Sequence, residues 1–527
     1  MSTPAATPLA VLKNYFGYDA FRLEQQAIID AVLGGHDVFA LMPTGGGKSL
    51  CYQIPALLLP GLTVVVSPLI ALMKDQVDAL RVNGIAAAYL NSSLSLEDQR
   101  AVIKQLERGE LKLLYTAPER LFGRDGDVLS LLKRVQVSLF AIDEAHCVSQ
   151  WGHDFRPEYL GLARLKKEFA HVPVIALTAT ADDLTRKDVL ERLGLHAARR
   201  FVSGFDRANI HYAVVPKQQS YERLLGFLAT RKNESGIIYT LSRQSTETLA
   251  AKLSADGFAA KPYHAGLDQG SKNKHQELFQ RDEVRIIVAT IAFGMGIDKS
   301  NVRFVVHMDL PKNLESYYQE TGRAGRDGLR SDALLFYSGG DVMKLKRFAE
   351  VEGNPEQTRI MLAKLWQMAD FCKSTTCRRQ QLLAYFGEQA KGECASCDIC
   401  APELASFGVG TASRKSSSPR GPSSKVGAQD LPYEHELFEA LRTLRRACAE
   451  REGVPAYIVF SDATLRELAT YLPLSLEAMR RIGGFGDVKI ERYGKEFLQA
   501  IFSYCAEHNL PTRMSKKADV PRAVKRW

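Results

Sequence analysis

The stretch MPTGGGKS, residues 42–49, follows an apolar run, Val38–Leu41, that indicates a buried parallel strand, and the segment after it can form a helix. A strand, a glycine turn and a helix in this order direct backbone N–H groups and the positive end of a helix at an anion. Lys48 adds a charge for the outer phosphates of a nucleotide, and Ser49 offers a hydroxyl to Mg²⁺. The pattern predicts a nucleotide-phosphate site made of Pro43, Thr44, Gly45, Gly46, Gly47, Lys48 and Ser49.

One residue of this stretch departs from the usual pattern of such loops. Met42 occupies the position where the first glycine normally stands. Taken by itself, the stretch could also be a flexible glycine turn between a strand and a helix. The motifs further along the chain favour the nucleotide site.

Length and composition indicate a globular protein with several domains. A chain of 527 residues exceeds what one hydrophobic core normally supports, so we expect three or four domains. With 46% hydrophobic and 24% charged residues, the composition is not that of a disordered chain. The first residues show no secretory pattern, and prolines interrupt the uncharged segment 49–73, so we expect no membrane span and a cytoplasmic protein. Nine cysteines, several in one cluster, favour a reducing compartment and a metal over disulfides.

The net charge of +9 is unevenly distributed. Residues 401–429 carry +3, residues 511–527 carry +5, and the segment between them, 430–510, carries −3. The two basic segments suit loose contact with a polyanion, or they are soluble linkers. The charge alone does not separate these two readings.

Apolar strand-like runs alternate with segments of helical length from residue 37 to about residue 336. This alternation predicts parallel sheets covered by helices, with ligand loops at the carboxyl ends of the strands. Two such units fit better than one oversized sheet, and we place their junction near residues 201–210. The runs are TVVVSP, LKLLYTAPE, VSLFAIDEA and PVIALTATA in the first unit, and SGIIYTLS, RIIVATIAFG, RFVVHMD and ALLFYS in the second.

The chain becomes helical in composition after residue 340. A cysteine cluster follows, and then a Ser-, Gly- and Pro-rich stretch that reads as a flexible linker. The next segment has a helical pattern throughout, with Ser461-Asp462 and Ser475 as expected N-caps. The expected order is a nucleotide-binding lobe (1–205), a second lobe (206–340), a zinc-binding subdomain (341–402), a basic linker (403–429), a small all-α domain (430–510) and a basic tail (511–527).

FAIDEAH, residues 140–146, places Asp143 and Glu144 directly after a buried strand. Mg²⁺ prefers hard oxygen ligands, so Asp143, opposite Ser49, would complete a nucleotide–metal site. Glu144 can orient or deprotonate the attacking water. A solvated acidic turn is the alternative, and the glycine loop upstream argues against it.

YYQETGRAGRDG, residues 317–328, places Arg323 and Arg326 in a loop of the second unit. Phosphoryl transfer gains most from positive charge aimed at the developing negative charge. Closure of the two units around ATP would bring these arginines to the phosphates. A basic surface turn is the alternative.

These motifs, with FGYDAFRLEQ (16–25), SQWGHDFRPEY (149–159) and SYYQETGRAGR (316–326), resemble the RecQ family of superfamily-two DNA helicases over residues 9–402. The resemblance implies two RecA-like motor domains. It implies that Tyr18 and Arg22 flank adenine and that Gln25 hydrogen-bonds its edge. The catalytic residues that it implies are Lys48, Asp143, Glu144, His146, Gln319, Arg323 and Arg326.

The loop after DEAH carries groups that can bind single-stranded DNA. Trp151 and Phe155 offer stacking faces, while His153 and Arg156 offer polar or phosphate contacts. An aromatic plug in the core is the alternative, although the run is unusually polar for one.

Cys377, Cys394, Cys397 and Cys400 are spaced C-x16-C-x2-C-x2-C. Four thiolates at such spacing suit tetrahedral Zn²⁺, and a closed four-sulfur shell is structural. The spacing is similar to that of the RecQ zinc-binding subdomain. Cys372 lies five residues before the first ligand, and we expect it to bind no metal.

Residues 430–510 resemble, more loosely, the helicase-and-RNase-D C-terminal (HRDC) domain. A face including Lys489, Arg492 and Lys495 could bind DNA, or the domain could be a docking module. RecQ proteins commonly carry a winged helix of about a hundred residues before this domain, and the 27 residues of 403–429 are too few for its core. The resemblance is therefore to a form that lacks the winged helix.

The leading hypothesis is an ATP-dependent DNA helicase that uses Mg²⁺ with ATP and a structural Zn²⁺, with 3′–5′ polarity by resemblance. The resemblance implies a nucleoid-associated monomer that binds single-stranded and forked or branched DNA in recombination and repair, and a single-strand-binding protein is a candidate partner. The alternative is an ATP-switched DNA-binding or strand-annealing protein. An RNA helicase shares the DEAH tetrapeptide, but the aromatic loop and the cysteine spacing argue against it.

Overall fold

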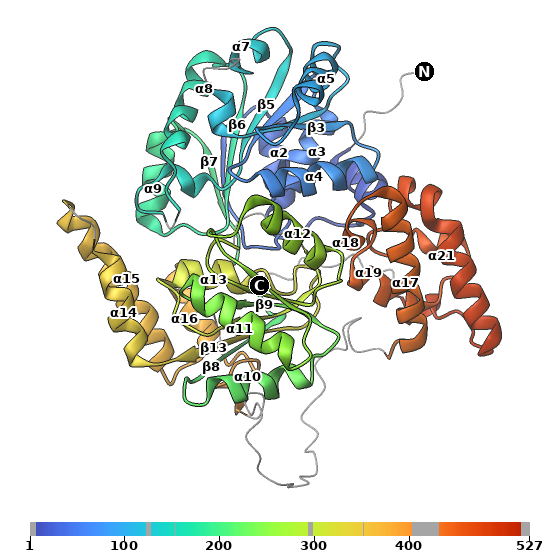
Figure 1. Ribbon diagram of the computed structural model, residues 1–527. Helices are drawn as coiled ribbons and strands as arrows, with labels where there is room; N and C mark the ends of the chain where they lie inside the picture. The colour runs from blue at the N-terminus through green and yellow to red at the C-terminus, as the bar shows by residue number, and fades with distance from the viewer. Residues whose placement is uncertain are drawn as a thin grey trace.

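The computed structural model describes residues 7–122, 128–152, 154–293, 299–350, 353–390, 392–402 and 432–517. Two parallel sheets lie one above the other, and helical parts flank them (Figure 1). This arrangement confirms the expected class of two RecA-like sheets, a helical cysteine-bearing region and a C-terminal all-α domain.

The first lobe is built on a seven-stranded sheet in the order β3-β4-β2-β5-β6-β1-β7, and all its pairings are parallel. Its strands are β1 (Val38–Leu41), β2 (Leu62–Val66), β3 (Ala87–Leu90), β4 (Leu113–Thr116), β5 (Val137–Ile142), β6 (Val174–Thr178) and β7 (Arg199–Val202). Phe39 and Leu41 pack into the core on one face, and Val38 and Ala40 pack on the other. Because helices cover both faces, β1 is a continuous apolar run.

The helices of this lobe divide between the two faces of its sheet. Those on one face are α2 (Gln25–Leu33), α3 (Leu50–Leu58) and α4 (Ile70–Val82), with α1 (Pro8–Val11) and η1 (Leu12–Phe16) beside them. Those on the other are α5 (Leu96–Glu107), α6 (Pro118–Leu121), α7 (Val128–Leu132), α8 (Ala163–Glu168) and α9 (Asp183–Arg192). Two 3₁₀ segments, η2 (Ala145–Val148) and η3 (Pro157–Leu162), follow β5.

The second lobe has a six-stranded parallel sheet in the order β10-β11-β9-β12-β13-β8. Its strands are β8 (Ile210–Pro216), β9 (Ser235–Tyr239), β10 (Ala260–Tyr263), β11 (Ile286–Ala289), β12 (Val302–His307) and β13 (Ser331–Tyr337). Its helices are α10 (Ser220–Ala229), α11 (Arg243–Ala255), α12 (Gln269–Gln280) and α13 (Leu314–Thr321). The chain passes from one sheet to the other between Val202 and Ile210, within the stretch predicted for the junction.

The eight predicted runs correspond to β2, β4, β5, β6, β9, β11, β12 and β13. Strands β3, β7, β8 and β10 were not predicted. Strand β7 lies at a sheet edge and is largely exposed, so its sequence, RRFV, lacks the continuous apolar run of a central strand.

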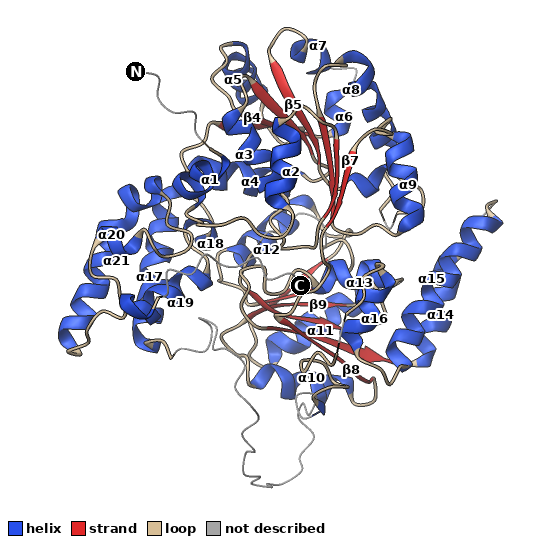
Figure 2. Cartoon of the chain, turned by 180° about the vertical axis from the view of Figure 1, so that it is seen from behind, coloured by secondary structure: helices blue, strands red, loops and turns tan. Residues whose placement is uncertain are grey.

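Two helical parts complete the chain (Figure 2). The cysteine-bearing part contains α14 (Gly339–Ala349), α15 (Pro355–Lys373) and α16 (Arg378–Tyr385). The C-terminal domain contains α17 (His435–Glu452), α18 (Ala456–Val459), α19 (Asp462–Tyr471), α20 (Leu476–Met479), α21 (Asp487–Glu507) and η5 (Met514–Lys516).

The predicted helix starts of the C-terminal domain are confirmed. The Ser461 hydroxyl accepts from the Thr464 N–H across 3.2 Å, and the Ser475 hydroxyl accepts from the Ala478 N–H across 3.1 Å. Each bond satisfies one N–H group that the first turn of a helix leaves unpaired.

The prediction that residues 511–527 form a basic tail outside the all-α domain is wrong for residues 511–517. Met514 is buried in the core of the C-terminal domain, Arg513 pairs with Glu434, and Lys517 pairs with Glu467. Acidic partners on the domain surface neutralise these cations, and the buried methionine holds the segment in place. The basic stretch 403–429 and residues 518–527 lie outside the described residues.

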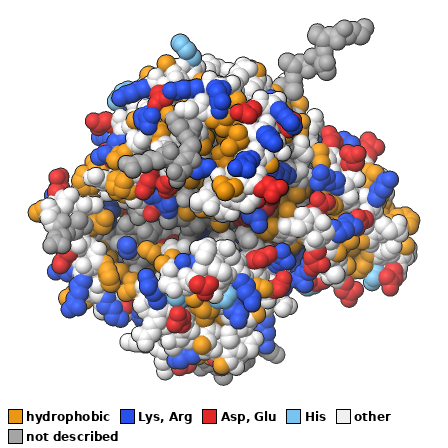
Figure 3. All heavy atoms as spheres, turned by 45° about the horizontal axis from the view of Figure 1, so that its top comes forward, with side chains coloured by type: hydrophobic (Ala, Val, Ile, Leu, Met, Phe, Trp, Pro, Cys, Tyr) orange, Lys and Arg blue, Asp and Glu red, His pale blue; other side chains and the backbone are white. Residues whose placement is uncertain are grey.

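Charged side chains of both signs are interspersed on the face seen in Figure 3. None of the helices that the structure describes is long and apolar enough to cross a membrane.

Candidate functional site

The glycine loop lies between the end of β1 and the start of α3, as predicted. Gly45 and Gly47 have φ angles of 78° and 77°, in the left-handed region that favours glycine. The Gln25 amide nitrogen donates to the carbonyls of Gly46 (3.1 Å) and Gly47 (3.0 Å). A Cβ atom at Gly47 would lie 2.5 Å from that nitrogen. Gln25 therefore supports the loop directly, in addition to its predicted contact with adenine.

The departure at Met42 has a structural reason. Its side chain is fully buried between the sheet and α3, and its sulfur lies 3.6 Å from the Cys51 sulfur. A methionine therefore fills the core at the base of the loop, where the usual glycine would leave space.

A cavity of about 390 Å³ joins the glycine loop to the predicted adenine, metal and arginine residues, a size within the usual range for small-molecule sites. Its predicted lining residues are Tyr18, Arg22, Gln25, Thr44, Gly45, Gly46, Gly47, Lys48, Ser49, Asp143, Glu144, Gln319, Arg323 and Arg326. Pro43 lies buried beneath the loop and accepts a hydrogen bond from the Gly46 N–H. The Arg22 guanidinium lies 5.8 Å from the Tyr18 ring centroid, which brings the two predicted adenine neighbours together.

The DEAH segment turns sharply after β5. Glu144 has a φ of 49°, a strained value for this residue, and its N–H donates to the Asp143 carboxylate across 3.0 Å. His146 is buried, and its Nδ1 lies 2.8 Å from the Thr178 hydroxyl at the end of β6 and 3.4 Å from the Glu144 carboxylate. His146 is thus placed behind the cavity, where it connects the DEAH segment to the neighbouring strand.

Arg207 was missed by the sequence analysis, and it connects the two lobes. Its buried guanidinium donates to the carbonyl of Thr44 in the glycine loop and to three carbonyls of the arginine loop, those of Gly322 (3.0 Å), Ala324 (2.8 Å) and Gly325 (3.1 Å). The available signal was a single arginine in FDRANI at the junction of the lobes, without a motif to mark it.

The aromatic loop packs back onto the DEAH segment outside the cavity. The Arg156 N–H donates to the Cys147 carbonyl (2.9 Å), and its guanidinium donates to Asp154 (2.9 Å) and to the Pro68 carbonyl (3.0 Å). The Tyr159 hydroxyl donates to the Asp143 carbonyl (3.1 Å). Trp151 and Phe155 are partly exposed, and His153 lies outside the described residues.

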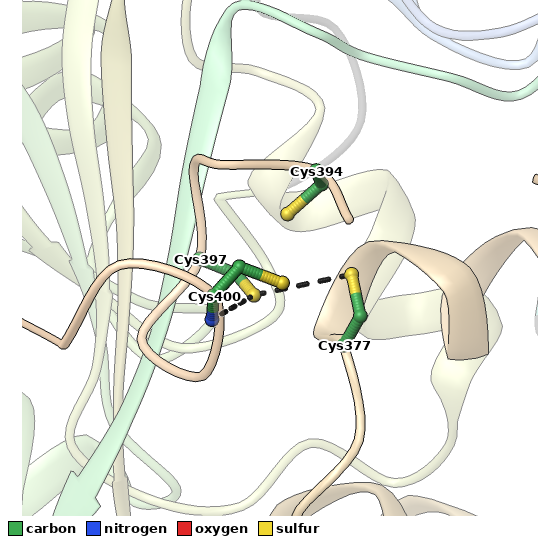
Figure 4. A group of neighbouring side chains, drawn as sticks. All are labelled: Cys377, Cys394, Cys397 and Cys400. Atoms are coloured by element: carbon green, nitrogen blue, oxygen red, sulfur yellow. Dashed lines mark hydrogen bonds between the residues drawn. The ribbon is translucent and has the colours of Figure 1, made fainter. Parts of the chain in front are cut away.

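The four predicted zinc ligands converge on one point (Figure 4). Their sulfur atoms all lie within 4.8 Å of one another, and those of Cys377 and Cys397 are 4.0 Å apart. Zn–S bonds of about 2.3 Å in a tetrahedron require sulfur atoms just under 4 Å apart, so the donors fit zinc. Cys372 is not part of the group, and burial raises the pKa of its thiol to about 12.

One prediction about the C-terminal domain is wrong. Lys489 does not share an exposed basic face with Arg492 and Lys495, because it lines the cavity described above and donates to the Ile458 carbonyl across 3.0 Å. Arg492 and Lys495 are exposed, and Arg492 lies 3.5 Å from Glu452.

Four family models match successive parts of the chain. They are the DEAD/DEAH box helicase (residues 22–189), the helicase conserved C-terminal domain (218–328), RecQ zinc-binding (339–401) and the HRDC domain (434–501). ATP-dependent DNA helicase RecQ of Haemophilus influenzae is 41% identical, covering 94% of this chain and 96% of that protein. The chain belongs to the RecQ family of ATP-dependent DNA helicases. The RecQ proteins of Pasteurella multocida and Bacillus subtilis are 42% and 36% identical and also cover 94% of this chain.

The fold of this RecQ chain is similar to that of solved helicase structures. Helicase Lhr of Mycobacterium smegmatis has a TM-score of 0.51 at 19% identity, covering 86% of this chain and 73% of Lhr. Mss116p has a TM-score of 0.51 at 18% identity, covering 70% of this chain and 86% of Mss116p. At these identities the likeness shows the motor fold alone.

The alignment with the Haemophilus influenzae RecQ spans 593 positions although it covers 94% of the 527 residues, so about a hundred positions have no counterpart here. This difference has the size expected for a winged helix. The absence of a winged helix from this RecQ chain stays a prediction.

Proposed function

We propose that this RecQ chain couples ATP hydrolysis to movement along single-stranded DNA, 3′ to 5′, and unwinds duplex or branched DNA in recombination and repair. One observation carries the proposal: the glycine loop, the DEAH carboxylates and the arginine loop, from two separate lobes, line one cavity. Hydrolysis at such a site changes the contacts between the lobes, and that change can move a bound strand.

The predicted roles of the cavity residues follow from their positions. Lys48 and the loop N–H groups hold the phosphates, and Ser49 and Asp143 would hold Mg²⁺, which supplies charge neutralisation when bound. Glu144 orients the attacking water, and Gln319 helps to position the reacting groups. Arg323 and Arg326 stabilise the charge that develops on the phosphates.

The aromatic loop would couple DNA to hydrolysis. Bases stacked on Trp151 and Phe155 would displace the segment that carries Asp143 and Glu144, because a backbone hydrogen bond and the Tyr159 hydroxyl join the two segments. Lys364 of α15 also donates to the Trp151 carbonyl (3.3 Å) and pairs with Glu315 of the second lobe (2.7 Å). A shift of the loop is therefore transmitted to both lobes.

The test is steady-state ATPase activity with and without single-stranded DNA, followed by strand separation on duplexes with a 3′ tail, a 5′ tail, a fork or blunt ends. Strong stimulation by DNA and unwinding of the 3′-tailed and forked duplexes are expected. Unwinding only from a 5′ tail would overturn the polarity, and stimulation by RNA alone would overturn the DNA assignment.

The alternative is an ATP-switched DNA-binding or strand-annealing protein. The stacking loop and the lobe-spanning cavity would serve it too. Flat hydrolysis with intact DNA binding and ATP-dependent annealing would favour it over the motor.

The four cysteines would hold a structural Zn²⁺. Cys397 pairs with Tyr212 of β8, so the metal would fasten the helical part to the edge of the second sheet. A closed four-sulfur shell leaves no position for a substrate.

The basic segment 403–429 would hold duplex DNA loosely in place of a winged helix. Neutralising Arg414, Lys415, Arg420 and Lys425 with glutamine should weaken the salt dependence of DNA binding, because fewer counterions are released. An unchanged salt slope and unchanged unwinding would remove this role. We further propose that the chain acts as a monomer and cooperates with a single-strand-binding protein, which sedimentation and pull-down with that protein would test.

A further inference from the structure

The nucleotide cavity has a wall that does not belong to the motor lobes. Besides the residues from both lobes, Tyr457, Phe460, Thr464, Gly484 and Lys489 of the HRDC domain line it. In Figures 1 and 2, α18 lies beside α4, and the HRDC domain lies along one side of the motor lobes. The domain therefore closes a side of the cavity that would otherwise face solvent.

Close backbone contacts hold the HRDC domain in this position. Gly17 has a φ of 71°, and a Cβ atom there would lie 2.5 Å from the Phe485 backbone. The Gly484 N–H donates to the Gly17 carbonyl across 3.1 Å. A larger residue at Gly17 would thus push the HRDC domain off the segment that carries Tyr18.

Further contacts are made along α4. Val82, at its end, is buried in the core of the HRDC domain, and Val488 lies against Gly84. The Asp75 carboxylate accepts from the Tyr457 hydroxyl of the HRDC domain (3.1 Å) and from the Gln280 amide of the second lobe (2.9 Å). One carboxylate of the first lobe thus joins three parts of the chain beside the cavity.

Lys489 is a cation in this wall with no anionic partner among the described residues. Its ammonium donates to the Ile458 carbonyl and lies 5.5 Å from the centroid of the Phe460 ring. Burial lowers its pKa to about 8, and no acidic group opposes that shift. A lysine held at this cost in the wall of a cavity that the glycine loop also lines gains most from an anion entering that cavity.

We propose that Lys489 is a nucleotide-binding residue, through which the docked HRDC domain contacts the phosphate chain of the bound nucleotide. The inference rests on the proposed nucleotide site and adds a binding residue from outside the two motor lobes. Its ammonium would form a charge-assisted contact with a phosphate oxygen, in addition to those made by Lys48.

The test is titration of the full chain with a fluorescent ADP and Mg²⁺, without DNA. Lys489→Gln should weaken binding roughly tenfold, as the loss of one charge-assisted contact predicts. Lys495→Gln, which neutralises an exposed lysine on the same helix, should leave binding unchanged. Competition by inorganic pyrophosphate should weaken in parallel in Lys489→Gln, because the contact is to phosphate. Unchanged ADP binding, or weakened ADP binding with unchanged pyrophosphate competition, would overturn the assignment.

A second variant tests the docking. Val488→Glu places a charge against Gly84 and should undock the HRDC domain. Its affinity for ADP should fall as much as that of Lys489→Gln, and the Val488→Glu/Lys489→Gln double variant should show no further loss. Phe502→Glu, on the exposed side of α21, is its matched control. An additive loss in the double variant would contradict a shared cause. The wild type and Lys48→Ala distinguish the proposed nucleotide site from the proposed role of Lys489. If the wild type does not bind ADP, the nucleotide site itself is rejected. If Lys48→Ala loses ADP binding and Lys489→Gln does not, only the role of Lys489 is rejected.

Discussion

Arg207 donates to the Gly322 carbonyl across 3.0 Å, and the same nitrogen donates to the Thr44 carbonyl, so one guanidinium joins the arginine loop to the glycine loop. A buried cation with several carbonyl partners is costly to remove, because those carbonyls lose their donor. Arg207 is therefore a positioning residue for the contact between the lobes.

Replacing Arg207 by alanine should lower kcat for ATP by about a hundredfold, while KM changes much less, because Lys48 and the loop N–H groups remain in place. Arg207→Lys should restore only part of the rate, since an ammonium cannot reach all the carbonyls that the guanidinium reaches. Arg200→Ala, at an exposed position on β7, is the matched control. A rise in KM with unchanged kcat would contradict a positioning role.

The alanine variants of Lys48 and Arg326 should lose ATPase activity for different reasons. Lys48→Ala should abolish nucleotide binding, whereas Arg326→Ala should keep binding and lower kcat by about a thousandfold, as for an arginine finger. Calorimetric ADP titration and steady-state ATPase assays separate the two effects, with exposed Arg330→Ala as control. Full activity of Arg326→Ala would mean that another cation serves the phosphates.

Trp151 should matter only when DNA is present. Trp151→Ala should keep the basal ATPase rate and lose most of its stimulation by single-stranded DNA, since a stacked base is worth about 1–3 kcal/mol. Trp366, a 45% exposed tryptophan on α15, offers the matched substitution to alanine. Equal losses in both variants would argue against a specific role of the loop.

The cysteine cluster should hold one zinc ion that stabilises the helical part. Cys397→Ser should lower the zinc content measured by atomic absorption and lower Tm by several degrees, because binding of a structural metal contributes to folding. Cys372→Ala should retain the metal, since this thiol lies outside the group. Full zinc content in Cys397→Ser would contradict the four-sulfur site.

The motor could largely be predicted from local patterns. Residues 42–49, 140–146 and 317–328 each carry a motif at the end of a strand or helix, and parallel strands bring such ends to one edge of a sheet. The cysteine spacing likewise predicted one cluster, because tetrahedral zinc restricts the separation of its ligands. Strand β7 was missed, because a largely exposed edge strand carries little apolar signal.

By itself the sequence determined the two parallel sheets, the residues that meet in the nucleotide cavity and the four-cysteine group, because strand periodicity and motif spacing are local properties. Only the tertiary structure decided that Arg207 joins the two lobes, that residues 511–517 pack onto the C-terminal domain, and that Lys489 faces the cavity and not solvent. Each of these depends on contacts between segments hundreds of residues or several elements apart. Their side chains look like ordinary surface charges until the fold buries them.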